Sequence, residues 1–229
     1  MAKKKTRKNS VKSARREWIE AIIIAFILAL IIRTFLLQAF KIPSGSMIPT
    51  LRPGDRILVN KLFYGPKIPF LGARLPRLKE LKRGEVIVFI YPPSAGKRNF
   101  ESFKQYLNDE TSGLLYRRML SFFKDTRSKS YIKRLIGLPG EAVQIKNGDI
   151  YINDELVENS RIRANTYFNE GPYGGADRIV DIPDNSYYCL GDNSSSSRDS
   201  RYWGFVNERF LTGKAFLIYW PLNRMRIIR

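Results

Sequence analysis

The 229-residue chain contains no histidine and only one cysteine, Cys189. A protein without histidine has neither a Ser-His-Asp nor a Cys-His mechanism available, and it builds no zinc site from imidazoles. A single cysteine excludes intrachain disulfides and cysteine clusters for zinc or iron–sulfur centres. Any chemistry must therefore use carboxylates, lysine, arginine, tyrosine or a hydroxyl group, and we expect no metal and no cofactor.

Acidic residues are few compared with basic ones. The chain has 21 Asp and Glu against 40 Lys and Arg, which gives a formal net charge of +19. Such an excess indicates a polyanionic partner, either nucleic acid or the anionic face of a membrane. Residues 1–17 hold eight of the basic side chains and one acid, Glu17, and they lie directly before an apolar run. This placement favours membrane lipids as the partner, with no nucleic acid.

The apolar run covers residues 18–40 and contains no proline or glycine. As a helix it would be about 33 Å long, which matches the hydrocarbon core of a bilayer. Arg33 lies beyond the midpoint, where its side chain can reach the interface. The run predicts one transmembrane helix over 18–40, with the basic tail 1–17 in the cytoplasm and residues 41–229 outside it. A cleavable signal peptide is the alternative, disfavoured because no clean small-x-small site follows.

Residues 41–229 are expected to be mostly β, as an antiparallel core with an appended β subdomain at 153–184. Short β-rich runs separated by glycine and proline carry this expectation, and Asn147-Gly148 between two alternating segments predicts a hairpin over 142–152. The insertion at 92–130 has helical spacing over 100–129, and that helix either packs on the sheet or lies on a membrane surface. The other predicted strands are 56–60, 85–91, 131–136 and 216–220.

Three clusters are candidates for chemistry: residues 42–51 (IPSGSMIPTL), 131–140 (YIKRLIGLPG) and 191–201 (GDNSSSSRDSR). Taken singly, each also fits an ordinary loop or a solvated strand face. A lysine that acts as a base needs a pKa near 7–8 instead of about 10.4, and apolar neighbours lower it by desolvation. In a chain without histidine, a serine with an unprotonated lysine is the available nucleophile–base pair.

Together these clusters resemble those of bacterial type I signal peptidases, the membrane-anchored serine–lysine endopeptidases that remove signal peptides from exported proteins. The resemblance covers the apolar run and most of 17–91, then 131–152 and 186–221. Two departures are visible. Glu85 stands where the family usually has aspartate, and residues 93–130 form a longer insertion than compact members carry.

The resemblance implies a role for each matching residue. Ser46 would be the nucleophile and Lys133 the general base, with the Ser46 backbone N–H and the Ser44 hydroxyl as oxyanion donors. Ser197 would hold the Lys133 amine in line. Asp199 and Arg201 would support that loop through an ion pair.

The family's substrates are signal peptides of exported preproteins that end in small-x-small sequences, so the resemblance implies two shallow apolar pockets. The substrate strand would add along residues 40–43. The implied location is the bacterial inner membrane, crossed once, with the N-terminus cytoplasmic and the catalytic part periplasmic. The positions that match the family's pocket are Phe40, Ile42, Pro43, Met47, Leu51, Ile57, Val88, Tyr131 and Ile132.

Three other interpretations each fit part of the sequence. A membrane-anchored basic binding protein without catalysis explains the charge but not the serine and lysine motifs. A self-cleaving serine–lysine repressor resembles the same core, but the apolar run and the lack of a helix-turn-helix signal count against it. Ser121 and Lys124 match the S-x-x-K pattern of penicillin-recognising enzymes, whose partner motifs are missing.

Overall fold

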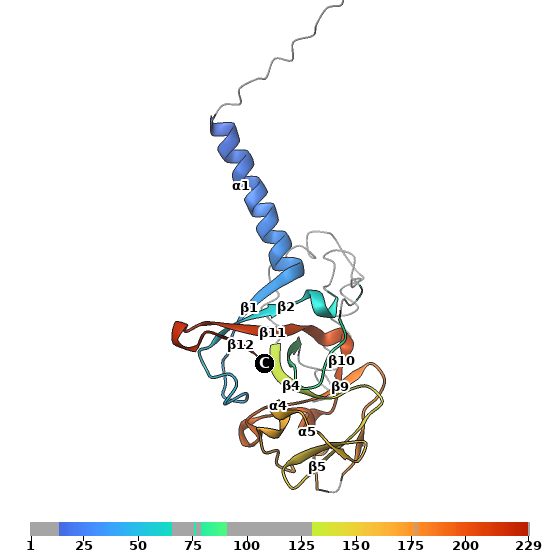
Figure 1. The fold of residues 1–229 in the computed structure, drawn as a ribbon. Helices are drawn as coiled ribbons and strands as arrows, with labels where there is room; N and C mark the ends of the chain where they lie inside the picture. The colour runs from blue at the N-terminus through green and yellow to red at the C-terminus, as the bar shows by residue number, and fades with distance from the viewer. Residues whose placement is uncertain (1–13, 66–75, 77–78, 91–129, 177, 229) are drawn as a thin grey trace, which may run out of the picture.

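The computed structural model of the chain describes residues 14–65, 76, 79–90, 130–176 and 178–228 (Figure 1). Most of the predicted insertion 92–130, with its amphipathic helix, lies outside these residues, as does most of the basic tail. The described part is mostly β, as predicted. Its strands form two antiparallel sheets, one of eight strands and one of four.

The larger sheet carries three of the predicted strands almost unchanged, and the run 216–220 is the second half of a longer strand. Its order is β1-β2-β11-β3-β4-β9-β10, with β12 paired to β11. The strand bounds are β1 (Leu37–Lys41), β2 (Arg56–Asn60), β3 (Val86–Ile90), β4 (Ser130–Gly137), β9 (Ser186–Leu190), β10 (Val206–Asn207), β11 (Leu211–Trp220) and β12 (Arg226–Ile227).

The smaller sheet has the order β7-β6-β5-β8 and is built on the predicted hairpin. Lys146 pairs with Asp149, and the two residues between them, Asn147 and Gly148, have φ of 51° and 86°. Positive φ at both positions is what a two-residue hairpin turn requires. The segment 153–184 thus completes a sheet that begins before it. The bounds are β5 (Ala142–Lys146), β6 (Asp149–Ile152), β7 (Glu155–Leu156) and β8 (Val180–Asp181).

The N-terminal helix is shorter than the predicted span. Helix α1 (Ala14–Ile31) passes into one π-helical segment, η1 (Ile32–Leu36), and the Leu37 N–H closes that segment on the Ile32 carbonyl before β1 begins. The predicted helix end at residue 40 is therefore wrong. Residues 37–41 pair with β2 instead, which supplies their backbone hydrogen bonds. Figure 1 shows α1 projecting from the β body, with β5 at the far end.

Within residues 14–65, 76, 79–90, 130–176 and 178–228, no helix combines the length and the apolar character needed to span a membrane.

Buried apolar side chains form three clusters. One lies under the smaller sheet and β9, a second packs around Phe89 and Leu135, and the third joins residues 42–51 to β2, β3 and β11. The second and third clusters involve strands of the larger sheet, and the candidate site lies there. Short helical segments complete the described chain: η2 (Leu62–Tyr64), α4 (Ser160–Arg163), η4 (Ser194–Ser196), α5 (Ser200–Trp203), η5 (Glu208–Phe210) and η6 (Leu222–Arg224).

Candidate active site

The structure brings Ser46 and Lys133 together. Lys133 lies on β4, opposite Ile87 of β3, and its side chain is buried with 2% exposure. Its Nζ lies 2.8 Å from the Oγ of Ser46. The serine is half-buried in the loop between β1 and β2, so its hydroxyl meets a buried amine on one side and is still partly open to solvent.

Burial lowers the pKa of the Lys133 amine from its ordinary 10.5 to about 8, because desolvation disfavours the charged form. The carboxylates of Asp199 and Asp192 oppose this effect, whereas the Arg201 guanidinium adds to it. A pKa near 8 leaves a useful fraction of the amine neutral at neutral pH. A neutral amine at hydrogen-bonding distance from a hydroxyl can accept its proton.

The loop that carries Ser46, residues 42–55, is fixed by hydrogen bonds between its two ends and by apolar packing of its middle. The Ile42 N–H donates to the Asp55 carbonyl at 2.8 Å, and the Gly54 N–H donates to the Ile42 carbonyl at 2.9 Å. Met47 and Leu51 are buried in the third apolar cluster. These contacts close the loop and anchor it, so that Ser46 is placed by the packing of its neighbours.

The loop 191–201 lies directly on the Ser46 loop. The backbone N–H of Asn193 donates to the Ser46 carbonyl at 3.1 Å, and its side-chain amide donates to the Gly45 carbonyl at 3.1 Å. The sequence pattern alone does not indicate this role of Asn193. Its neighbour Ser194 accepts a hydrogen bond from the Phe168 N–H, which links this loop to the segment 153–184.

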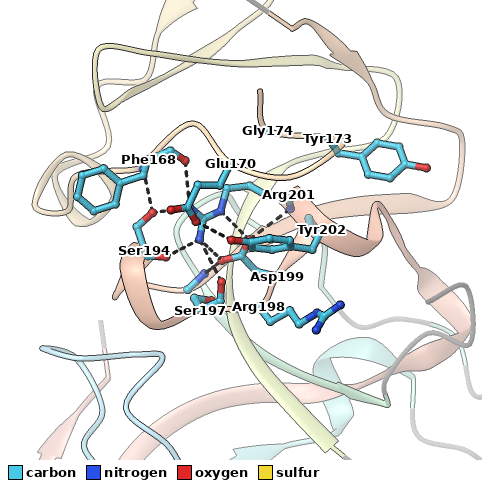
Figure 2. Close-up of polar contacts among 12 residues, drawn as sticks. Phe168, Glu170, Tyr173, Gly174, Ser194, Ser197, Arg198, Asp199, Arg201 and Tyr202 are labelled. Carbon is cyan, nitrogen blue, oxygen red and sulfur yellow. Dashed lines mark hydrogen bonds and ion pairs between the residues drawn. The ribbon is translucent and has the colours of Figure 1, made fainter. Parts of the chain in front are cut away.

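Arg201 organises the loop 191–201 from within (Figure 2). Its fully buried guanidinium pairs with Asp199 at 2.9 Å and donates to the carbonyls of Phe168, Ser194 and Ser197. Asp199 also accepts from the Gly191 N–H at 3.0 Å and, as the N-cap of α5, from the N–H of Arg201 in the first turn of that helix. Because the buried charges of Arg201 and Asp199 are paired and hydrogen-bonded to the loop backbone, they stabilise its conformation.

Ser197 does not make the contact that the resemblance implies. Its hydroxyl is buried and has no hydrogen-bond partner among the described residues, and the hydrogen bond recorded for the Lys133 amine goes to Ser46. The Ser197 side chain packs against the Cα of Gly191, beside the Ser46 carbonyl. A buried hydroxyl without a hydrogen-bond partner is uncommon in folded proteins.

A second buried ion pair, which was not predicted from the sequence, links the loop 42–55 to the loop 191–201. Arg134 donates to Asp192 through its Nε and one terminal nitrogen, at 2.7 and 2.6 Å. The same terminal nitrogen also donates to the Thr50 hydroxyl, and the other terminal nitrogen donates to the Gly84 carbonyl. The Thr50 hydroxyl also donates to Asp192 at 2.5 Å. An arginine inside an apolar strand pattern was the available signal, but nothing local identified its partner.

Glu85, which stands where the family usually has aspartate, makes its contacts away from Ser46 and Lys133. Glu85 is buried and accepts from the Lys214 amine at 2.6 Å and from the Tyr64 hydroxyl at 3.2 Å. None of these contacts involves Ser46 or Lys133, so the longer carboxylate ties β3 to β11 and η2 instead.

Most of the positions expected to contact substrate gather in one place. Tyr131 lies apart, with Phe89 in the second cluster, because neighbouring residues on a strand face opposite sides of the sheet. Pro43 is exposed and belongs to none of the three clusters. Leu51, Ile57 and Val88 are fully buried, so they lie in the interior of the cluster. The positions that meet in the third cluster are Phe40, Ile42, Met47, Leu51, Ile57, Val88 and Ile132.

The described residues contain no group of three or more His, Cys, Asp or Glu placed to hold a metal ion. What the site does contain is a half-buried serine hydroxyl beside a buried amine of lowered pKa, on a β scaffold. With this geometry a neutral lysine could take the proton of the serine, which is chemistry that serves acyl transfer and hydrolysis.

Comparisons with known proteins agree with this class. A family model described as "Signal peptidase, peptidase S26" matches residues 15–220. The chain is 32% identical over 228 residues to a probable signal peptidase I-2 of Synechocystis sp., covering 98% of this chain and 84% of the relative. It is also 32% identical over 232 residues to signal peptidase I T of Bacillus subtilis, covering 95% of both.

A solved signal peptidase I from Enterococcus faecalis V583 is 25% identical, with a TM-score of 0.36, and the match covers 59% of this chain and 97% of that one. On the family match and the sequence relatives, the chain belongs to the signal peptidase family, peptidase S26.

Proposed function

We propose that this chain is a membrane-attached serine endopeptidase that removes signal peptides from exported preproteins, with Ser46 as nucleophile and Lys133 as general base. The observation that carries the proposal is the 2.8 Å approach of the buried Lys133 amine to the Ser46 hydroxyl. Relatives named signal peptidase I, matched over nearly the whole chain, support the substrate class.

The reaction proceeds in two halves. Neutral Lys133 takes the proton of Ser46 as Oγ forms a bond to the scissile carbonyl carbon. The ammonium then gives this proton to the leaving amine as the C–N bond breaks, which leaves an ester on Ser46. Lys133 next takes a proton from water, the hydroxide attacks the ester, and the proton returns to Ser46 as the C–O bond breaks.

The tetrahedral intermediate carries a negative oxygen that needs hydrogen-bond donors. The Ser46 backbone N–H and the Ser44 hydroxyl supply them, and each preorganised donor of this kind is worth about 3–4 kcal/mol. Ser44 is exposed, so its hydroxyl is free to turn toward the oxyanion. The buried Ser197 hydroxyl lies beside the Ser46 carbonyl without a partner among the described residues; it makes no hydrogen bond to the Lys133 amine, and the proposed steps use Ser46 and Lys133 alone.

The substrate backbone pairs with the outer edge of β1, which ends the sheet in the described part of the chain. Ile42 directs its N–H and C=O toward residues 54–55. Since these groups alternate along a strand, the N–H and C=O of Lys41 and the C=O of Pro43 point to the other edge. Phe40 and Ile132 are the partly buried members of the third cluster, so they are the surface that a small side chain meets.

Helix α1 attaches the protein to the membrane. Its large apolar side chains are exposed all around, from Trp18 at 72% to Leu28 at 55%, with Ile24 at 65% between them. A helix that is apolar on every side belongs in a protein core or in lipid. The basic residues at its start place the N-terminus in the cytoplasm. Extraction of membranes at high pH tests this attachment. We expect the full chain to stay with the lipid and an Ile23→Glu/Ile27→Glu variant to be released.

The activity is tested with a preprotein whose signal ends in Ala-x-Ala. Purified wild type is compared with Ser46→Ala and Lys133→Met, and Ser195→Ala serves as a control because that serine is exposed. We expect cleavage after the alanine by wild type and control, and loss of at least about 10³-fold in both folded variants. Full activity in either variant contradicts the assigned pair. An inert wild type favours the membrane-anchored basic binding protein.

A further inference from the structure

Residues 221–228, here called the strap, turn back from β11 and lie against the Ser46 loop. The strap contains η6 and β12, and β12 pairs with β11 through Ile227 opposite Leu217 and Arg226 opposite Ile218. From Arg224 to Ile228, alternate positions face opposite ways, whereas Leu222 lies in η6. Leu222, Met225 and Ile227 are 67%, 54% and 65% exposed, whereas Arg224, Arg226 and Ile228 contact the rest of the protein.

Arg224 holds the far end of the Ser46 loop. Its Nε and one terminal nitrogen each lie 2.9 Å from an oxygen of Asp55, which is 1% exposed. The same carboxylate accepts the Arg52 N–H at 2.8 Å, and the Asp55 carbonyl accepts the Ile42 N–H that closes the loop. Asp55 therefore joins the strap to both ends of the loop.

Arg226 holds the middle of the loop. One of its nitrogens donates to the Thr50 carbonyl at 2.7 Å, while the Thr50 hydroxyl is engaged by Asp192 and Arg134. The strap therefore contacts the backbone of Thr50, and the buried Arg134–Asp192 pair contacts its side chain. Ile228 is 6% exposed and packs in the same apolar cluster as Met47, the neighbour of Ser46.

We infer that Arg224 and Arg226 are positioning residues for Ser46. Through Asp55 and Thr50 they hold the loop 42–55 so that the Ser46 hydroxyl stays at hydrogen-bonding distance from Lys133. Both arginines are partly solvated, with the Arg224 side chain 21% exposed and Arg226 exposed. The single exposed hydrogen bond of Arg226 adds little to global stability, whereas Arg224 neutralises the buried Asp55 carboxylate, so its loss also lowers stability. A displacement of about 1 Å at a reacting atom, however, lowers the rate by about 10²-fold.

This inference rests on the proposed function, and the test separates the two. Steady-state cleavage of the Ala-x-Ala preprotein is measured for full-length wild type, Arg224→Gln, Arg224→Lys, Arg226→Gln and Asp55→Asn. The controls are Met225→Gln, on the outward face of the strap, and Arg163→Gln, which removes an exposed pair with Glu158. Thermal unfolding of each variant is followed in parallel.

We expect kcat to fall about tenfold or more in Arg224→Gln, Arg226→Gln and Asp55→Asn, with KM within about threefold of wild type. The Asp55→Asn/Arg224→Gln double variant should lose no more than either single change, because both act through one contact. Arg224→Lys should be intermediate, since a single amine does not reproduce the two-pronged contact. The pH at half-maximal kcat should stay unchanged, because Arg224 is not among the groups that shift the Lys133 pKa.

Folded variants with kcat within twofold of wild type overturn the positioning role, even if their unfolding temperature is lower. Equal losses of kcat in the two controls overturn it as well. Should Arg224→Gln not fold, Arg226→Gln decides the matter, because it removes a single exposed hydrogen bond. A wild type that leaves the preprotein uncut contradicts the proposed function itself.

Discussion

Lys133 Nζ and Ser46 Oγ lie 2.8 Å apart although 87 positions separate the two residues in the chain. One comes from a strand inside the larger sheet and the other from a loop that leaves the sheet edge. The loop reaches β4 because its apolar side chains pack under β2, β3 and β11, and because Asn193 holds the Ser46 carbonyl from the other side. The pair is thus a product of packing between distant segments.

Cleavage should rise with pH through the titration of Lys133. The base works only when neutral, and burial brings its pKa to about 8. We expect kcat to increase tenfold per pH unit below about pH 7 and to level off above about pH 9. The measurement is kcat of the wild type between pH 6 and pH 10, with a substrate that has no groups titrating in this range. A flat profile, or one that falls as pH rises, contradicts an amine base.

Lys133→Met should fold more stably than wild type at neutral pH. The pKa of the amine is about 8 in the folded protein and near its ordinary 10.5 in the unfolded chain. Below pH 8 the amine is charged in both states, but only the unfolded chain solvates the charge. Its burial therefore destabilises folded wild type by up to about 3 kcal/mol. Wild-type stability then recovers between pH 8 and 10.5.

Urea unfolding of both proteins at pH 7 and pH 10 checks this prediction. The advantage of Lys133→Met should shrink at the higher pH. Lys146→Met serves as control, because that lysine is 40% exposed, and it should show no such dependence. An advantage that grows with pH would contradict the lowered pKa.

Gly191→Ala should impair catalysis. A Cβ at this position would run into the Ser197 side chain and come within 2.6 Å of the Ser46 carbonyl oxygen. Because backbone on one side and a packed loop on the other leave little room, we expect the Ser46 loop to shift and kcat to fall by about 10²-fold. Gly175→Ala is the matched control, since its Cβ would meet nothing nearer than 3.9 Å. Equal activity in both variants would show that the loop yields without moving Ser46.

Breaking the Arg134–Asp192 pair should destabilise the whole domain. Both side chains are buried, so Arg134→Met leaves an unpaired carboxylate and should lower the free energy of unfolding by about 3–5 kcal/mol. The Arg134→Met/Asp192→Leu variant should recover part of this loss, because no charge is left buried. Denaturant titration measures all three proteins. A loss as small as that of Arg163→Gln, whose pair with Glu158 is exposed, would show that water reaches Asp192.

Local patterns in the sequence were enough for several elements. The hairpin at 142–152 follows from Asn147-Gly148, whose backbone preferences act within the turn. The strands at 56–60 and 131–136 follow from short β-rich runs between turn residues. The serine and lysine motifs could also be read from the sequence, because the absence of histidine leaves few other nucleophile–base pairs.

The remaining features depend on contacts between distant segments. Residues 37–40 continue an apolar run that reads as helix, yet they become a strand because β2 offers them a pairing edge. Tyr131 points away from the site because successive side chains of β4 lie on opposite faces of the sheet, and Tyr131 lies on the face of the second cluster. Asp192 reaches Arg134 across 58 positions, and Arg226 reaches Thr50 across 176. The sequence by itself indicated the candidate serine and lysine and determined where local turns form. Only the tertiary structure decided which buried charges pair and what holds Ser46 in place, because packing sets long-range partners and no local propensity encodes them.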